Sequence, residues 1–477
     1  MCATICFSFC AGKSTMIYKA YILDSTLREG EQTPGVSFSI AEKLEIAQKL
    51  DEVGVTMIEA GHPNVSPDVH EAVKKIASLG LNAEILAHAR AVKADVDAAV
   101  RCDVDRVAIF LGTSQIHLHD KLHLNQEEAI NRVFEVTAYA RAHGLKVRFT
   151  AEDASRTDYA YLVKICKAAV EAGADRISVP DTVGIMMPFA VNSFYSKLTK
   201  EIDVEFDSHC HNDLGMAGAN TLAALEGGAT AAHVTVNGLG ERTGIAALAE
   251  VATALKVIYD VDTVKLEQLP ALSVLVERYS GVVRSQNSPI VGENAFSHKS
   301  GVHTAGVLVN PATYEAFPPE LIGRHRAIII DKYTGRHAVR YQLKRLGIQL
   351  NEHQIEAVVE AIKKNPGMRN YRDADLVDLA EKASGLKFSA AVPQKVEVLI
   401  MVKCDSNIYT TAVARKISAL KGVIDVNEIG GEFDIAAKVV ADSVSELNQT
   451  LEGIRGVGGV IGTNSSLVLK KFGSNNQ

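Results

Sequence analysis

Two histidines one residue apart are the first feature of the chain that could do chemistry. His209 and His211 lie in the stretch DSHCHNDLG, residues 207–215. Side chains two positions apart on an extended segment point to the same face, so both imidazoles can bind one ion, whereas Cys210 points away. A metal site needs a third ligand. The alternative is a pair of packed histidines that bind no ion.

A carboxylate near the first strand is the candidate third ligand. Glu29 lies in DSTLREGEQT, residues 24–33, just past the first β-rich run. Two imidazoles and one carboxylate with open positions suit a divalent metal ion that also holds a bidentate oxygen ligand, such as a 2-oxo acid. The adjacent Arg28 could neutralise negative charge that develops on the ketone oxygen. A salt bridge to a nearby acid is the other interpretation of Arg28.

A further group of polar residues occupies alternate positions of one predicted strand. Arg148, Thr150 and Glu152 in VRFTAEDASR, residues 147–156, therefore share one face. A guanidinium and a hydroxyl on one face suit a carboxylate ligand, and an internal Arg148–Glu152 ion pair is the alternative. Thr182, in PDTVG at the end of the next strand, is a further candidate, with helix capping as its alternative role.

The elements that must position these residues follow a repeating order. From residue 18 to about 259 a short β-rich run, a loop and a stretch of helical period alternate eight times. The expected strands are 20–24, 56–60, 83–87, 106–111, 146–150, 176–180, 204–208 and 232–236, and the clearest helices are 40–53, 67–79, 125–143, 158–172, 216–227 and 244–258. This order predicts an α/β protein with a closed (β/α)8 TIM barrel, because the polar candidates follow strand ends and would converge on one mouth. An open doubly wound sheet is the alternative.

The rest of the chain divides into further parts. We predict an unstructured or mis-called N-terminus (1–17), with Met16 as an alternative first residue, and then the catalytic barrel (18–270). A linker with a helical subdomain (271–392) and a C-terminal domain (393–477) follow. The last part alternates strand, helix, strand, strand, helix, strand, which is the order of a ferredoxin-like βαββαβ domain.

Composition limits the classes of partner. The 477 residues carry a net charge of -7 with both signs mixed, so we expect no nucleic-acid binding. No apolar run reaches the roughly 18 residues of a membrane helix, so we expect no membrane insertion. Seven scattered cysteines do not suggest a secreted disulfide scaffold, and a cytoplasmic location is the prediction.

Five motifs together carry a resemblance to a known family. LDSTLREGEQTPG, FTAEDASRTD, VPDTVG, HCHNDLGMAGAN and NGLGERTG resemble the metal-dependent acyltransferase and lyase barrels that include the isopropylmalate, citramalate and homocitrate synthases. The resemblance covers about 18–340. It implies a divalent metal ion (Mg, Mn, Zn or Co) on Glu29, His209 and His211, with Arg28 stabilising the oxyanion.

The resemblance also implies the reaction and the assembly. Acetyl-CoA, as co-substrate, loses a methyl proton, its enolate attacks a 2-oxo acid, and the thioester is hydrolysed. In this family a histidine from the linker acts in the partner subunit's site, which implies a homodimer or a larger homo-oligomer. His303 in SHKSGVH is the matching histidine, Tyr314 accompanies it, and Glu152 completes the catalytic set. His298 is the weaker candidate.

Two features favour the homocitrate synthase branch, which uses 2-oxoglutarate in lysine biosynthesis. Glu29 stands where isopropylmalate synthases usually carry Asp, and Arg148 matches a position that contacts the far carboxylate of 2-oxoglutarate. A buried arginine without a partner beside a bare isopropyl tail would be costly. The other substrate contacts implied are Gln32, His88, Thr150 and Thr182.

Three alternatives are weighed against this branch. EAGHP, residues 59–63, is closer to the branch that uses 2-oxoisovalerate or pyruvate. An amino-acid-sensing protein with a degenerate barrel is an alternative from another class, and the candidate acids, imidazoles and Arg at the mouth weigh against it. A lyase is disfavoured because GLGERTG, residues 238–244, lacks the catalytic cysteine of those enzymes.

The C-terminal part has a resemblance of its own. Residues 395–473, with GGEFDIAAKVVA at their centre, resemble the amino-acid-sensing module of the Lrp/AsnC regulators. The resemblance implies an amino-acid effector, and lysine, the pathway product, is the hypothesis. A domain that only strengthens assembly is the alternative.

Overall fold

The computed structural model describes residues 17, 19–365, 370–388, 396–405, 408–441 and 444–467. The chain divides into two compact units. The first runs to Ser297 and includes Glu315–Arg326, and the second contains His298–Tyr314 and the chain from Ala327 onward. The expected N-terminal segment lies outside the described residues except for Ile17, which is buried. The expected boundary at 392/393 also lies outside them.

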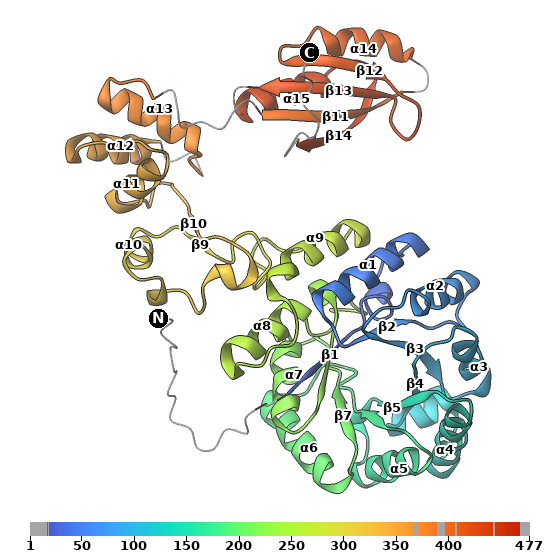
Figure 1. The fold of residues 1–477 in the computed structure, drawn as a ribbon. Coiled ribbons are helices and arrows are strands. Elements are labelled where there is room, and N and C mark those ends of the chain that lie inside the picture. Colours follow the sequence, from blue (N-terminus) through green and yellow to red (C-terminus); the bar gives the residue numbers. More distant parts are fainter. Residues whose placement is uncertain are drawn as a thin grey trace. The chain divides into compact units, whose positions relative to one another are not determined.

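Eight parallel strands close into a barrel in chain order, and helices surround them (Figure 1). The strands are β1 (Tyr21–Asp24), β2 (Met57–Gly61), β3 (Glu84–Arg90), β4 (Arg106–Gly112), β5 (Lys146–Glu152), β6 (Arg176–Ser178), β7 (Glu205–Ser208) and β8 (Ala231–Val234). The helices are α1 (Ile40–Val53), α2 (Pro67–Ala77), α3 (Lys93–Arg101), α4 (Gln126–Ala142), α5 (Tyr159–Glu171), α6 (Pro188–Glu201), α7 (Ala217–Glu226), α8 (Leu248–Tyr259) and α9 (Leu269–Ser280). The predicted TIM barrel is confirmed.

Local sequence signals explain where the helices begin and end. Ser39 and Glu42 form a reciprocal capping box at the start of α1, and Gly54, with φ of 98°, ends it in the left-handed conformation. Asn125 and Glu128 form the same box at α4. Short helical turns occupy several loops: η1 (Gly30–Gln32), the π-helical η2 (His117–Leu122), η3 (Ala154–Arg156), η4 (Val236–Gly238), η5 (Leu266–Gln268) and η7 (Pro319–Ile322).

The barrel separates an apolar exterior from a polar interior. The large core lies between the strands and the surrounding helices, with residues such as Ile22, Ile58 and Phe149 fully buried. On the inner face β1, β2, β3 and β8 contribute a small apolar cluster of Leu23, Met57, Leu86 and Ala231. The other inward positions carry many acids, arginines and histidines, so the interior can support chemistry at the mouth.

The second unit contains helical and ferredoxin-like parts, each with its own core. Its first elements are β9 (Ser297–His298, which begins at the unit boundary), α10 (Gly301–Val309), η6 (Pro311–Thr313), β10 (Ala327–Ile328), α11 (Arg336–Arg345), α12 (Glu352–Lys364) and α13 (Asp373–Ser384). The helical part of the subdomain expected within 271–392 therefore includes the three helices α11, α12 and α13.

The C-terminal elements follow the predicted order of a ferredoxin-like domain. They are β11 (Val396–Cys404), α14 (Thr410–Ser418), β12 (Val423–Glu428), β13 (Ile435–Ala441), α15 (Val444–Arg455) and β14 (Val460–Leu467). The strands form an antiparallel sheet in the order β12-β13-β11-β14. Within the part of the chain described, no helix has both the length and the apolar character to cross a membrane.

Candidate active site

A cavity of about 280 Å³ opens at the C-terminal ends of the barrel strands. It is lined by Arg28, Glu29, Gln32, His88, Phe110, Lys121, Arg148, Thr150, Glu152, Ser178, Pro180, Thr182, His209, His211, His233, Glu241 and Arg242. All ten barrel residues predicted from the sequence to bind metal or substrate, or to act in catalysis, line this one cavity. This is the end of the fold at which TIM-barrel enzymes hold their active sites.

Three of these residues bring potential metal-ligand atoms together. Glu29, His209 and His211 are buried and each offers an atom within 4.8 Å of the others. The two histidine Nε2 atoms are 3.4 Å apart, a spacing that allows both to reach one ion. Isolated β-bridges from Asp181 to Cys210 and from His211 to Ile245 keep the chain extended past β7, so the two imidazoles share a face.

The glycine-rich loop after β8 packs directly on the candidate ligand Glu29. A Cβ at Gly240, whose φ is +154°, would lie 3.1 Å from Glu29 Oε1 and 3.0 Å from Gly244 Cα. The Glu241 backbone N–H donates to the same Oε1 at 3.1 Å. Glycine is therefore required here for close approach, and the loop orients the carboxylate.

Arg28 forms two partly buried ion pairs. Its Nε lies 2.6 Å from Glu59 Oε2 and its Nη1 lies 2.5 Å from Glu29 Oε2. Burial alone would raise the pKa of Glu59, but Arg28 and Arg148 hold it well below its usual range. The guanidinium is thus fixed beside the candidate ligand, as a group that stabilises a developing oxyanion must be.

Arg148 pairs with a different acid from the one weighed in the sequence. Only 1 % of its side chain is exposed, and its Nη2 lies 2.6 Å from Glu59 Oε1. Glu152 instead accepts hydrogen bonds from Lys121 Nζ at 2.8 and 2.9 Å. The internal Arg148–Glu152 pair is therefore not observed. Because Glu59 is its partner, Arg148 does not need a charged substrate to balance its charge.

Several buried polar atoms around the cavity lack a hydrogen-bond partner among the described residues. They are Arg148 Nε, Thr150 Oγ1, Ser178 Oγ and His211 Nδ1. Leaving a buried polar atom unpaired costs about 1–3 kcal/mol, so such atoms at a cavity wall indicate a polar ligand. A polar ligand with acceptor oxygens would supply partners for those of these atoms that donate.

The remaining predicted contacts also have defined surroundings. His88 stacks on Phe110 with ring centroids 4.5 Å apart. Burial, followed by the field of Arg28, holds the pKa of His88 well below its usual value, so its imidazole is neutral. Thr182 Oγ1 accepts a hydrogen bond from the Asp153 backbone N–H at 2.9 Å, which ties the ends of β5 and β6 together.

The two residues predicted from the linker lie in the second unit. His303 lies on α10 and stacks on Tyr314, with ring centroids 4.1 Å apart and an interplanar angle of 26°. Both side chains are exposed. The two rings contact each other. Their joint action in one site stays a prediction.

Sequence reasoning did not assign roles to three residues of the cavity network. Glu59, on β2, contacts Arg28 and Arg148. His233 lies on the inner face of β8 and contacts Arg148, and Lys121 of η2 donates to Glu152. Strand alternation could have placed Glu59 and His233 inside the barrel. A π-helical turn has no clear sequence signal, so Lys121 could not have been found.

Comparisons with known proteins agree along most of the chain. Residues 19–276 match the HMGL-like family, 290–369 match the homocitrate synthase post-HMGL domain-like family, and 397–477 match the Lrp/AsnC ligand binding domain. Homocitrate synthase of Sulfurisphaera tokodaii is 53% identical over 459 residues, which are 95% of this chain and 100% of that protein. Homocitrate synthase of Saccharolobus islandicus is 52% identical over the same shares.

A solved structure supports the fold. Hydroxymethylglutaryl-CoA lyase from Pseudomonas aeruginosa has a TM-score of 0.52 and 21% identity, and the match covers 57% of this chain and 96% of that one. The family matches and the near full-length relatives confirm both resemblances drawn from the sequence. The chain belongs to the homocitrate synthase family, as an HMGL-like barrel followed by the post-HMGL domain of these enzymes and an Lrp/AsnC ligand-binding domain.

Proposed function

We propose that the chain is a homocitrate synthase, an acyltransferase that condenses acetyl-CoA with 2-oxoglutarate and hydrolyses the thioester. The observation that carries the proposal is that one cavity contains both the Glu29, His209 and His211 group and the buried Arg148. The first group suits the keto acid end of 2-oxoglutarate, and Arg148 suits its far carboxylate.

Glu29, His209 and His211 would hold a divalent metal ion. Two imidazoles and one carboxylate are a donor set typical of such an ion, and the polar atoms nearby that lack a partner among the described residues fit a chelated oxygen ligand. When bound, the ion polarises the keto group toward attack. Binding measurements with Mg, Mn, Zn and Co would identify which metal ion the site prefers.

The other residues bind the acceptor and stabilise charge. Arg28, fixed by Glu59, points a cation at the oxygen that gains charge during attack. The acceptor contacts Arg148, Thr150, Gln32, His88 and Thr182. Arg148 Nε has no hydrogen-bond partner among the described residues and is therefore suited to donate to the far carboxylate.

Deprotonation of acetyl-CoA requires a positioned base. His303 is that base in our proposal, with Tyr314 and Glu152 assisting the proton transfers, and the second unit supplies it to the barrel of the partner subunit in a homodimer or larger homo-oligomer. The contact between the His303 and Tyr314 rings supports a joint role.

The test is a thiol-release assay with acetyl-CoA and a panel of 2-oxo acids, with and without a divalent metal. We expect coenzyme A release with 2-oxoglutarate at the highest kcat/KM, and none above background after metal removal. Release with no 2-oxo acid of the panel would refute the synthase, and equal release in chelator would refute the metal role.

One observation favours a second candidate. Because Glu59 already neutralises Arg148, an acceptor with an uncharged tail would leave no unpaired charge in the cavity. The alternative is condensation with 2-oxoisovalerate or pyruvate. The same panel separates the candidates, since the preferred acceptor then lacks a second carboxylate.

We further propose that the C-terminal domain binds an amino-acid effector, with lysine as the first candidate. The match of residues 397–477 to the Lrp/AsnC ligand binding domain supports this role. Isothermal titration with lysine and with the other amino acids would test it. Binding of none of them would reject the sensory role.

A further inference from the structure

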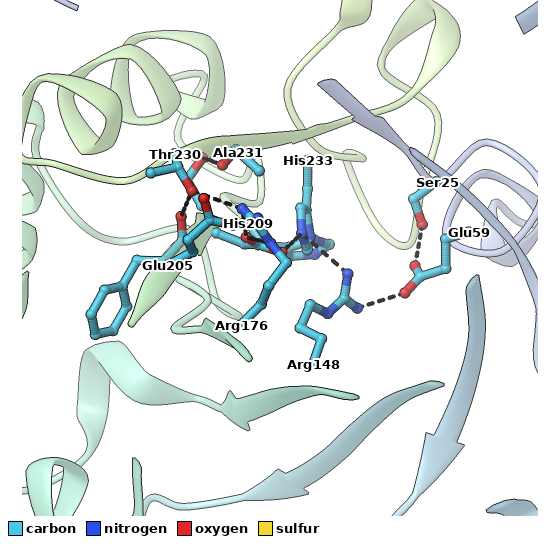
Figure 2. Close-up of polar contacts among 12 residues, drawn as sticks. Ser25, Glu59, Arg148, Arg176, Glu205, His209, Thr230, Ala231 and His233 are labelled. Carbon is cyan, nitrogen blue, oxygen red and sulfur yellow. Dashed lines mark hydrogen bonds and ion pairs between the residues drawn. The ribbon is translucent and has the colours of Figure 1, made fainter. Parts of the chain in front are cut away.

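His233 connects the candidate metal site to a buried acid. Its side chain, on β8, is 1 % exposed, and its two ring nitrogens face different partners. Nδ1 lies 3.2 Å from His209 Nδ1, and Nε2 lies 3.1 Å from Asp207 Oδ2. Figure 2 shows His233 between His209 and Arg148.

The positions of the protons along this chain depend on one another. Two imidazole nitrogens that share a hydrogen bond need one N–H and one lone pair. His209 can bind a metal through Nε2, which faces His211, only if its own hydrogen is on Nδ1. His233 must then accept at Nδ1 and carry its hydrogen on Nε2, where Asp207 is the acceptor.

Asp207 is held as an acceptor by Arg176. Arg176 Nε donates to Asp207 Oδ1 at 2.7 Å, and its Nη2 lies 2.6 Å from the same oxygen. A second arginine competes for the imidazole, since Arg148 Nη1 lies 3.2 Å from His233 Nε2. If Arg148 donated there, His233 would carry its hydrogen on Nδ1 and His209 would be forced to carry its own on Nε2.

The local charges decide between these two arrangements. Arg148 already has a carboxylate partner, because its Nη2 lies 2.6 Å from Glu59 (Figure 2). Asp207 can only accept, so a hydrogen on Nε2 gives it a charge-assisted hydrogen bond, whereas an Nε2 lone pair would face the carboxylate without one. The contacts therefore favour the arrangement in which the Nε2 lone pair of His209 faces the metal site.

We propose that His233, anchored by Asp207, is a positioning residue that keeps the hydrogen of His209 on Nδ1 and so presents its Nε2 lone pair to the metal ion. This inference rests on the proposed metal site. The other candidate ligand lacks such support, since His211 Nδ1 is buried without a partner among the described residues. The protein thus orients one imidazole of the pair through its own side chains.

A matched pair of substitutions tests the proposal. His233→Leu keeps a similar volume but removes the acceptor, whereas His233→Asn is smaller but can place its carbonyl oxygen near the position of Nδ1. Affinity for Co²⁺ is measured by competition with a chelator, and the visible absorption of the bound ion reports its coordination. We expect the Leu variant to bind about 10- to 100-fold more weakly, as for other residues that support a ligand, and the Asn variant to recover most of that loss.

The outcomes distinguish a failure of the role of His233 from a failure of the proposed metal site. Equal losses in both variants, or a Leu variant within about twofold of the parent protein, would overturn the role of His233. A parent protein that binds no Co²⁺ would instead reject the proposed metal site. If the Leu variant does not fold, Asp207→Asn is measured, because its amide can donate to His233 Nε2 and should weaken binding with both histidines retained; unchanged affinity there also overturns the proposal.

Discussion

Substitution of Arg148 by methionine isolates the contact that would select the acceptor. The guanidinium is 1 % exposed and its Nη2 lies 2.6 Å from Glu59 Oε1. A bound 2-oxoglutarate would bury its far carboxylate against this cation, and in the variant that carboxylate would be left without it. Removal of one partner of a buried charge pair costs about 2–5 kcal/mol, which corresponds to roughly a 30- to 5,000-fold loss in kcat/KM.

The assay compares two acceptors in the same variant. We expect kcat/KM for 2-oxoglutarate to fall by that factor in Arg148→Met, while kcat/KM for 2-oxoisovalerate changes by less than about threefold, since its tail carries no charge. The ratio of the two values removes losses shared by both acceptors, such as a smaller fraction of folded enzyme. Glu59 retains Ser25 Oγ and Arg28 Nε, each at 2.6 Å, so the variant should fold.

A matched control comes from another arginine inside the barrel. Arg106 on β4 is also buried and pairs with Glu84, but it does not line the cavity. Arg106→Met should lower the thermal midpoint without changing the ratio of the two acceptors. If Arg148→Met keeps its kcat/KM for 2-oxoglutarate within about threefold of the parent enzyme, or if both acceptors lose equally, the reasoning on acceptor choice is wrong.

Three further predictions follow from the same contacts. Glu29→Gln should weaken binding of Mn²⁺ by at least about tenfold in a titration, because one of three candidate ligands loses its charge; unchanged affinity would exclude Glu29 as a ligand. Burial raises the pKa of Asp24 to about 7, so the folded protein keeps a proton there that the unfolded chain loses above about pH 4. Asp24→Asn should therefore match the metal-free parent protein in thermal midpoint near pH 4 and exceed it above pH 7, and a difference that does not change with pH would contradict this. A chain that ends at residue 393 should keep condensation activity and lose inhibition by lysine, and unchanged inhibition would move the effector site to the barrel.

The barrel was predictable because its signals are local. Each β-rich run became a strand within a few residues of its expected ends, and serine or asparagine caps and glycines set the helix limits. The alternation of Arg148, Thr150 and Glu152 along β5 placed all three in the cavity. The HxH spacing gave the paired imidazoles for the same reason.

The partners of these residues were not predictable, because they depend on contacts across the barrel. Glu59 meets Arg148 across 89 positions of sequence, and His233 meets Arg148 across 85. The periodicity of the sequence predicts which face a side chain occupies. It does not predict which of several charged side chains on that face it contacts. The sequence therefore predicted a role for Arg148 in substrate binding, but it could not show that Glu59 already neutralises the guanidinium.

The proposed reaction requires that three side chains far apart in the sequence hold one metal ion that also binds the keto acid. A crystal structure of the protein grown with Mn²⁺ and 2-oxoglutarate, with anomalous data for the metal, measures this directly. We expect one anomalous peak coordinated by Glu29, His209 and His211 and by two oxygens of the acceptor. A peak elsewhere, or a structure with Glu29 remote from the two histidines, would contradict it.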